Sequence, residues 1–230
     1  MLAPVKSRSL RDQVAASLRE AMFRGELRPG EPLREMQLAR KLQVSQATVR
    51  EALFQLEQAG LVVRVANKET IVTNLSATEV KERVAVRIAL EGMACIEAAR
   101  RMEKAQFVEL ENKLHEISRA IKENAYVNLT QADNEFHRYI WSQSGNEILA
   151  KTLRHVSTPL FAFAGLLLSG HHVSLKNVVN SHELIVDAMR AGKSRVIAES
   201  IREHVETSYH GFLNSGLLDF RGLAEQGKSR

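Results

Sequence analysis

The sequence predicts a mainly α-helical protein with two domains, and three observations lead to this fold class. Residues 1–75 combine short amphipathic helical patterns with two runs of β-branched residues, whereas residues 76–230 show helical periodicity alone. Ser76 and Glu79 have the spacing of a capping box, which marks the start of a helix. We therefore divide the chain into a small mixed domain, residues 1–75, and an all-α antiparallel bundle of about six helices, residues 76–230.

Three helices are predicted in the first domain. Apolar residues at helical spacing between Leu10 and Met22 predict the first helix. The segment LREMQLARKLQVSQATVREALFQLEQAGL, residues 33–61, predicts two further helices joined by a tight turn, because each carries an apolar stripe on one face. Ser45 is placed to cap the third helix, and Gly60 follows its end.

A two-stranded hairpin is predicted directly after the third helix. In LVVRVANKETIVTNL, residues 61–75, two β-branched runs flank a polar tip at residues 66–70. Three helices followed by a two-stranded wing form a winged helix-turn-helix. For the two helices taken without the hairpin, an ordinary helical hairpin with a solvated polar face is the alternative.

Candidate DNA contacts lie at the N-terminal end of the third helix. Gln46, Thr48 and Arg50 remain outside its apolar face, in the part of a helix-turn-helix that enters the major groove. Arg34, before the second helix, and Lys68, at the wing tip, complete the candidates. Residues 1–75 hold 12 Lys or Arg and 8 Asp or Glu, so most of the chain's net charge of +5 lies in this domain, as phosphate binding requires.

This domain resembles the N-terminal winged helix of the GntR family of bacterial transcription regulators. The resemblance rests on RGELRPGEPLRE followed by LARKLQVSQATVREALFQLEQAGLV. Thr48 and Arg50 keep the family pattern, but Gln46 replaces the usual Arg and Glu69 the usual Gly of the wing tip. Gln pairs with adenine where Arg favours guanine, so the first departure bears on the operator sequence. A carboxylate at the tip is repelled by phosphates, so the second bears on how deeply the wing enters the DNA.

Composition limits the class and compartment of the protein. A hydrophobic content of 44% is enough for real cores, and 230 residues suit two domains of ordinary size. Cys95 is the single cysteine, and the segment MLAPVKSRSL lacks the apolar core of a signal peptide, so a reducing cytoplasm is expected. The longest apolar stretch, residues 156–168, is too short to span a bilayer, and no membrane association is expected.

The second domain is predicted to be a bundle of six helices. The first runs from Ser76 to about Met102 and the others cover about 104–123, 130–143, 147–168, 176–191 and 194–213. Bundles build ligand and metal sites from side chains that face inward. In the first of these helices we expect the inward side to hold Val80, Val84, Ile88, Met93 and Ile96.

Four residues of this bundle form a candidate metal site. Asp133 and His137 are four apart on one helix and therefore project from the same face. His182 and His204 lie on two further helices, and the apolar neighbours of His204 indicate an inward face. Three imidazoles with one carboxylate suit a divalent transition metal such as zinc, nickel, cobalt or manganese. For each histidine taken singly, the alternative is an ordinary core or surface residue, which is more common than a ligand.

The bundle resembles the FCD domain of the FadR-type branch of GntR regulators. The matching segments are VRIALEGMACIEAAR, DNEFHRYIWSQSGN, SHELIVDAMRAGK and EHV. The resemblance implies that Asp133, His137, His182 and His204 bind a divalent metal, with zinc or nickel expected first, which keeps positions open for a small carboxylate effector. It also implies that Arg87 pairs with the effector's anionic group. A surface or dimer-interface salt bridge between Arg87 and a nearby acid such as Glu91 is the alternative.

The predicted function is therefore a transcription regulator that binds a palindromic operator on double-stranded DNA as a homodimer. A small organic acid at the metal is expected to shift the bundle and, with it, operator affinity. A metal-ion sensor and a purely structural metal are alternatives. A metalloenzyme is the rival of another class, but no motif places a general base beside the four ligands, and we expect no enzyme activity.

Overall fold

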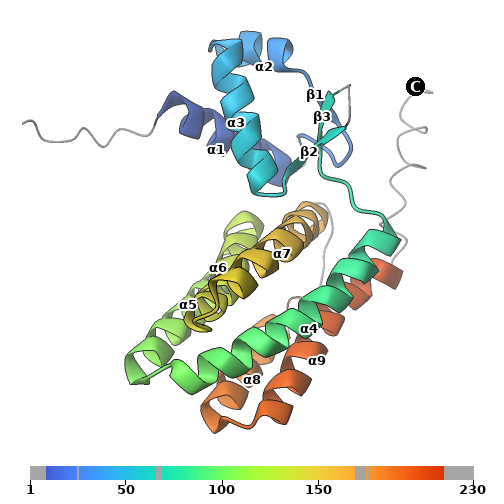
Figure 1. Cartoon of the computed structure of the whole chain (residues 1–230). Helices are drawn as coiled ribbons and strands as arrows, with labels where there is room; N and C mark the ends of the chain where they lie inside the picture. Colours follow the sequence, from blue (N-terminus) through green and yellow to red (C-terminus); the bar gives the residue numbers. More distant parts are fainter. Residues whose placement is uncertain (1–8, 25, 66–68, 169–174, 176, 215–230) are drawn as a thin grey trace, which may run out of the picture. The chain divides into compact units, whose positions relative to one another are not determined.

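The computed structural model describes residues 9–24, 26–65, 69–168, 175 and 177–214. The chain divides into two compact units, Met1–Asn74 and Leu75–Arg230, and each is described by itself (Figure 1). Both consist mainly of helices, as the sequence predicts. No helix within the described residues is long and apolar enough to cross a membrane.

The described residues of the first unit form three helices around a small apolar core. They are α1 (Leu10–Phe23), α2 (Glu35–Leu42) and α3 (Gln46–Gln58). The Ser45 side chain caps α3 by accepting a hydrogen bond from the backbone N–H of Thr48, because the first amides of a helix have no partner within it. The buried apolar residues of α1 and α3 are Val14, Leu18, Met22, Val49, Leu53 and Leu56.

The wing has one strand more than the sequence analysis expected. Strands β2 (Val62–Val65) and β3 (Glu69–Val72) form the predicted antiparallel hairpin, and β1 (Pro32–Leu33) pairs with the other edge of β3, in the order β1-β3-β2. A strand of two residues has no alternation to detect, since its pairing depends on β3 and not on its own sequence. The segment before α2 is thereby held against the wing.

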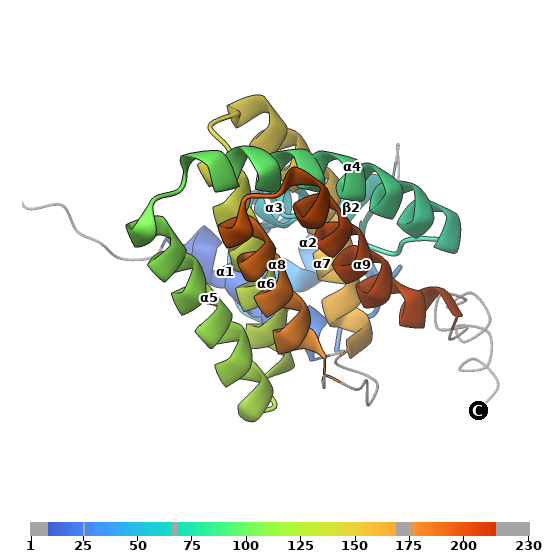
Figure 2. The same cartoon turned by 90° about the horizontal axis from the view of Figure 1, so that it is seen from below.

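The second unit is a helical bundle, as predicted. Figures 1 and 2 show α9 beside α4, and α9 also packs against α8, while α6 packs between α5 and α7. Two starts differ from expectation: α6 begins four residues earlier than the predicted 130, and α8 begins two residues after the predicted 176. The described helices are α4 (Ala77–Arg101), α5 (Lys104–Lys122), α6 (Tyr126–Gln143), α7 (Glu147–Leu168), α8 (Val178–Ala191) and α9 (Ser194–Asn214).

The inward face of α4 is more polar than expected. Val80 and Val84 are buried, but Met93 is 53% exposed, and the charged residues Arg87 and Glu91 are buried in its place. A helix turns 100° per residue, so a long helix drifts away from any single apolar line. Periodicity favoured the apolar Met93, whereas packing placed an ion pair inside the bundle.

Candidate metal centre and nucleic-acid interface

Asp133, His137, His182 and His204 come together inside the bundle from three helices, α6, α8 and α9. One ligand atom from each lies within 4.8 Å of those from the others. His137 Nε2 is 3.1 Å from His204 Nε2 and 3.6 Å from Asp133 Oδ1, and His182 Nε2 is 2.7 Å from Asp133 Oδ1. Ligands bound at about 2.0–2.2 Å to one zinc ion are roughly 3–4 Å apart, so small side-chain movements suffice to enclose an ion.

The outer nitrogen of each histidine has its own partner. His137 Nδ1 is 2.5 Å from Glu91 Oε1, and His182 Nδ1 is 2.7 Å from the carbonyl oxygen of Val178. His204 Nδ1 is 3.1 Å from Ser181 Oγ. Because the hydroxyl of Ser181 donates to the Val178 carbonyl, its oxygen is left to accept from His204. Such partners fix the tautomer of metal-bound histidines and direct the other nitrogen to the ion.

These contacts leave the centre of the cluster with unmatched lone pairs. His137 and His204 each use a proton at Nδ1, so two Nε2 lone pairs face each other across 3.1 Å. Both nitrogens of His182 face acceptor oxygens, although a neutral imidazole has only one N–H. A divalent cation at the centre removes both conflicts, because it accepts the lone pairs and replaces the missing proton. The residues present therefore fit a metal ion.

Burial sets the protonation of the cluster. Burial lowers the pKa of His137, and it lowers that of His204 well below the ordinary value, where the neighbouring His182 acts in the same direction. Burial alone would raise the pKa of Asp133, but the hydrogen bond from His182, together with the neighbouring His137 and Arg87, outweighs burial and holds the pKa below its ordinary value. Neutral imidazoles and an ionised carboxylate are the forms that bind metals.

Arg87 is buried beside this cluster, and it forms the ion pair with Glu91 that was the alternative, but inside the bundle and not at a surface. Its Nε donates to Glu91 Oε2 over 2.7 Å, and its Nη1 donates to the Tyr209 hydroxyl over 3.3 Å. The guanidinium carbon lies 4.4 Å from the centre of the Phe161 ring. Its Nη2 is buried and has no hydrogen-bond partner within the described part of the chain. A charged donor without an acceptor is expensive inside a protein, so this atom is available to an anionic group.

The DNA-contact candidates on α3 are held by an acid from α2. Glu35 accepts from Arg50 Nη2 over 2.8 Å and from Gln46 Nε2 over 2.9 Å, and this pairing lowers the pKa of Glu35. The Arg50 side chain remains 58% exposed. Thr48 is half-buried, and its hydroxyl lies 2.8 Å from Ser45 Oγ, so this side chain also takes part in the helix cap.

The two remaining candidates belong to the wing region. Arg34 precedes α2 and is exposed, and its Nε lies 3.5 Å from Glu69 of β3. The departure from the usual Gly at residue 69 therefore also supplies a partner for Arg34. Lys68 lies outside the described residues.

Sequence reasoning missed the residues that support both sites. Glu91 appeared there only as a surface partner for Arg87, and Glu35, Ser181 and Tyr209 were not singled out. The signal available for Glu91 was its spacing four residues after Arg87. The other partners are distant in sequence, since 15 residues separate Glu35 from Arg50 and 122 separate Arg87 from Tyr209.

Comparisons with known proteins agree with this architecture. The chain is 26% identical over 212 residues to the uncharacterized HTH-type transcriptional regulator YdhC of Bacillus subtilis, covering 92% of this chain and 91% of that protein. It is 28% identical over 202 residues to a probable D-xylose utilization operon transcriptional repressor of Paenarthrobacter nicotinovorans, covering 86% and 88%. The solved structure of E. coli McbR/YncC shares the fold, with a TM-score of 0.74 at 21% identity over 92% of this chain and all of that one.

Family models account for both units. Residues 10–72 match the gntR family of bacterial regulatory proteins, and residues 82–207 match the FCD domain. The relatives are regulators and not enzymes. The chain is therefore a transcription regulator of the gntR family whose C-terminal domain is an FCD domain, and its helix-turn-helix implies that it binds DNA.

Proposed function

We propose that this regulator binds a palindromic operator as a homodimer and responds to a small carboxylate held at a divalent metal in the bundle. The observation that carries the proposal is the convergence of Asp133, His137, His182 and His204 with their lone pairs unmatched. The metal would supply positive charge and coordination positions for the effector's carboxylate. The chain's own part is to orient the three imidazoles and to exclude water around them.

Charge favours an anionic effector. Arg87 and Glu91 neutralise each other, whereas Asp133 contributes a single negative charge to the cluster. A divalent ion there would leave a net charge of +1 in a buried site, which one carboxylate would balance. The buried Arg87 Nη2 adds a donor for the same group. These features support a small acid more than a neutral sugar or an acyl chain.

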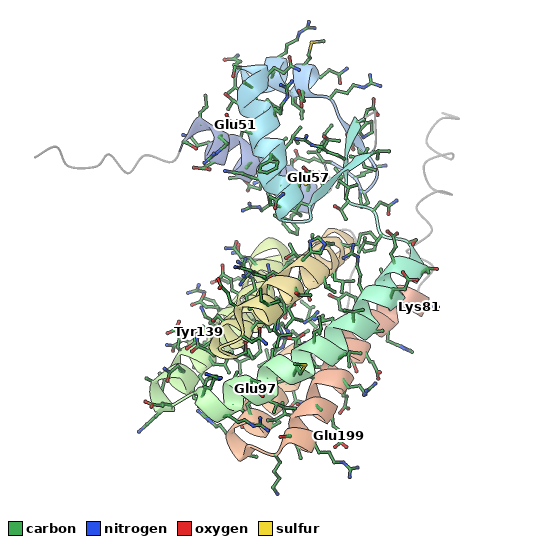
Figure 3. The ribbon with its side chains drawn as sticks, viewed as in Figure 1. Glu51, Glu57, Lys81, Glu97, Tyr139 and Glu199 are labelled. Carbon is green, nitrogen blue, oxygen red and sulfur yellow. The ribbon has the colours of Figure 1, made fainter. Side chains whose placement is uncertain are left out.

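Metal content tests the site directly. Untagged protein purified without chelator should contain about one transition metal per chain by elemental analysis, with zinc or nickel expected first. The His182→Ala variant should lose this metal. The control substitution Glu199→Gln, at an exposed position of α9, should keep it (Figure 3). Metal-free wild-type protein that takes up neither zinc nor nickel would overturn the ligand assignment.

Regulation by the metal alone is the second candidate, because the four ligands form a site without any organic molecule. Titration of operator binding with zinc or nickel, with and without a panel of small carboxylates, separates the two functions. An effector-responsive regulator changes its operator affinity only when the acid is added. A metal sensor changes it with free metal alone.

The role of α3 is tested with Arg50→Ala. The probe is a duplex selected by the wild-type protein from a random pool, and a gel-shift titration gives the affinity. We expect a loss of about 1–3 kcal/mol of binding free energy, the range for one good base contact, with metal content unchanged. Arg24→Ala, which removes an exposed arginine of the same unit, is the matched control. Equal affinity of wild type and Arg50→Ala would remove Arg50 from the interface.

A further inference from the structure

Glu91 is a buried, hydrogen-bonded acid of the bundle interior. It lies on α4, is fully buried, and accepts from three donors of two helices. Its Oε1 is 2.5 Å from His137 Nδ1 and 2.9 Å from Trp141 Nε1, and its Oε2 is 2.7 Å from Arg87 Nε. Neither the metal cluster nor the anion contact includes Glu91 itself.

We propose that Glu91 is a positioning residue that joins the metal centre to the anion-binding arginine. The proposal rests on the proposed metal site. By accepting the Nδ1 proton of His137, Glu91 directs the Nε2 lone pair to the ion. By accepting from Nε of Arg87, it sets the plane of the guanidinium and leaves Nη2 for an anion.

The shared contacts of Glu91 with His137 and Arg87 have a regulatory consequence. His137 lies on α6 and Arg87 on α4, and one carboxylate fixes both side chains. A ligand that moves Arg87 therefore acts on a metal ligand through a single shared group, and the metal acts on Arg87 in return. Affinity for zinc and affinity for a carboxylate such as acetate should each rise when the other is bound, and the part of this coupling that passes through Arg87 should depend on Glu91.

The first test measures zinc affinity by competition with a chromophoric chelator. Glu91→Gln should weaken zinc binding by about 10- to 100-fold, the usual effect of removing such a partner of a ligand histidine. Glu97→Gln, on the exposed side of the same helix where Glu97 pairs with Arg100, is the matched control (Figure 3). Wild-type affinity in Glu91→Gln would overturn the inference, whereas a wild type that binds no zinc would overturn the proposed metal site instead.

A double-mutant cycle distinguishes positioning from general support of the fold. If Glu91 acts through His137, then Glu91→Gln should cost affinity in the wild-type background but almost none in the His137→Ala background. In the background of the control variant Glu97→Gln, which keeps His137 and the other ligands, the full effect of Glu91→Gln should persist. The absorption spectrum of bound cobalt(II) should change in Glu91→Gln. Equal effects in every background, with an unchanged spectrum, would make Glu91 a structural residue only.

A second variant protects the test against misfolding. Glu91→Gln leaves Arg87 buried without a charge partner, so the paired replacement Arg87→Met with Glu91→Leu removes both charges together. This double variant should fold, lose the same 10- to 100-fold in zinc affinity, and show weaker coupling between zinc and acetate than the wild type, because only the direct contact of the carboxylate with the metal remains. Wild-type zinc affinity in the folded double variant would contradict the positioning role.

A different observation in the first unit supports a second inference. Glu35 binds Gln46 and Arg50 together, and a carboxylate only accepts hydrogen bonds. The amide of Gln46 must therefore turn Nε2 to Glu35 and Oε1 away from it. We infer that Glu35 is a specificity-determining residue, because it leaves Oε1 and the second Nε2 hydrogen to form the bidentate pair with adenine.

Selection from a random duplex pool tests this inference. The base pair read by Gln46 is the one whose preference disappears in Gln46→Ala. Wild-type protein should select A·T there, and Glu35→Ala should lose that preference while positions read by neither Gln46 nor Arg50 keep theirs. Glu20→Ala removes an exposed acid from α1 and controls for the change in net charge. Selection of G·C at this position, or an unchanged preference in Glu35→Ala, would overturn the inference; absence of any enrichment by the wild type would contradict DNA binding itself.

Discussion

Arg87 shows at the scale of a single residue how a charge is kept inside a helical bundle. Its side chain is 2% exposed and Glu91 is fully buried, so neither charge is solvated by water. Burial opposes the ionisation of Arg87, but its pKa is raised because Glu91 and Tyr209 lie against it. Burial also opposes the ionisation of Glu91, but Arg87 and His137 outweigh it, so the pKa of Glu91 is lowered. Removing one member of such a pair leaves the other unpaired in a medium of low dielectric constant.

Arg87→Met should therefore destabilise the bundle by about 3–5 kcal/mol. The addition of Glu91→Leu should recover part of this loss, because it removes the unpaired charge but leaves the His137 and Trp141 donors without an acceptor. The free energy of unfolding is measured by urea unfolding followed by Trp141 fluorescence. Trp141 is the single tryptophan, and its Nε1 donates a hydrogen bond to Glu91. A single variant as stable as the wild type would show that water reaches Glu91.

Helix α1 shows at the scale of an element how one acid joins a helix to its neighbour. Asp12 completes the capping box with Ser9, and its Oδ1 accepts from Gln55 of α3 over 2.8 Å. The hydrogen bond from Gln55, followed by that from Ser9, lowers the pKa of Asp12 to about 2. The ionised form therefore favours the folded unit, since the unfolded chain takes up a proton at higher pH.

Asp12→Asn should lower the stability of the first unit at neutral pH. Because the folded pKa is depressed, the difference from wild type should be constant above about pH 5 and should shrink as the pH falls through about 4 towards 2. Thermal unfolding by circular dichroism measures it, with Glu20→Gln on the same helix as the control. A difference independent of pH would show that the carboxylate's charge plays no part.

At the scale of the whole molecule, the bundle surrounds its polar site with an apolar shell. His137 lies edge-on to Phe136, at 5.4 Å between ring centres, and near Phe161, at 5.5 Å. The site draws ligands from α6, α8 and α9, while α4 supplies their support. An ion bound there would connect elements distant in sequence, so metal binding and folding of the bundle are thermodynamically linked.

Zinc should therefore stabilise the bundle of the chelator-treated protein. At a free concentration 100 times the dissociation constant, the expected gain is about 2.7 kcal/mol, and the Trp141 transition should shift accordingly. His182→Ala should show no such shift. Equal stabilisation of both proteins would place zinc elsewhere on the molecule.

The sequence by itself determined the two domains, the succession of helices and the family, because helical periodicity, capping residues and turn signals are local. Asp133 and His137 could be paired from their spacing on one helix. His182 and His204 could be proposed as ligands from their places on two further helices, and the family pattern strengthened that prediction. The tertiary structure alone decided that Glu91 holds His137 and Arg87, that Glu35 holds Gln46 and Arg50, and that Pro32 and Leu33 join the wing. Each of these depends on groups brought together by packing, which the pattern of one segment does not contain.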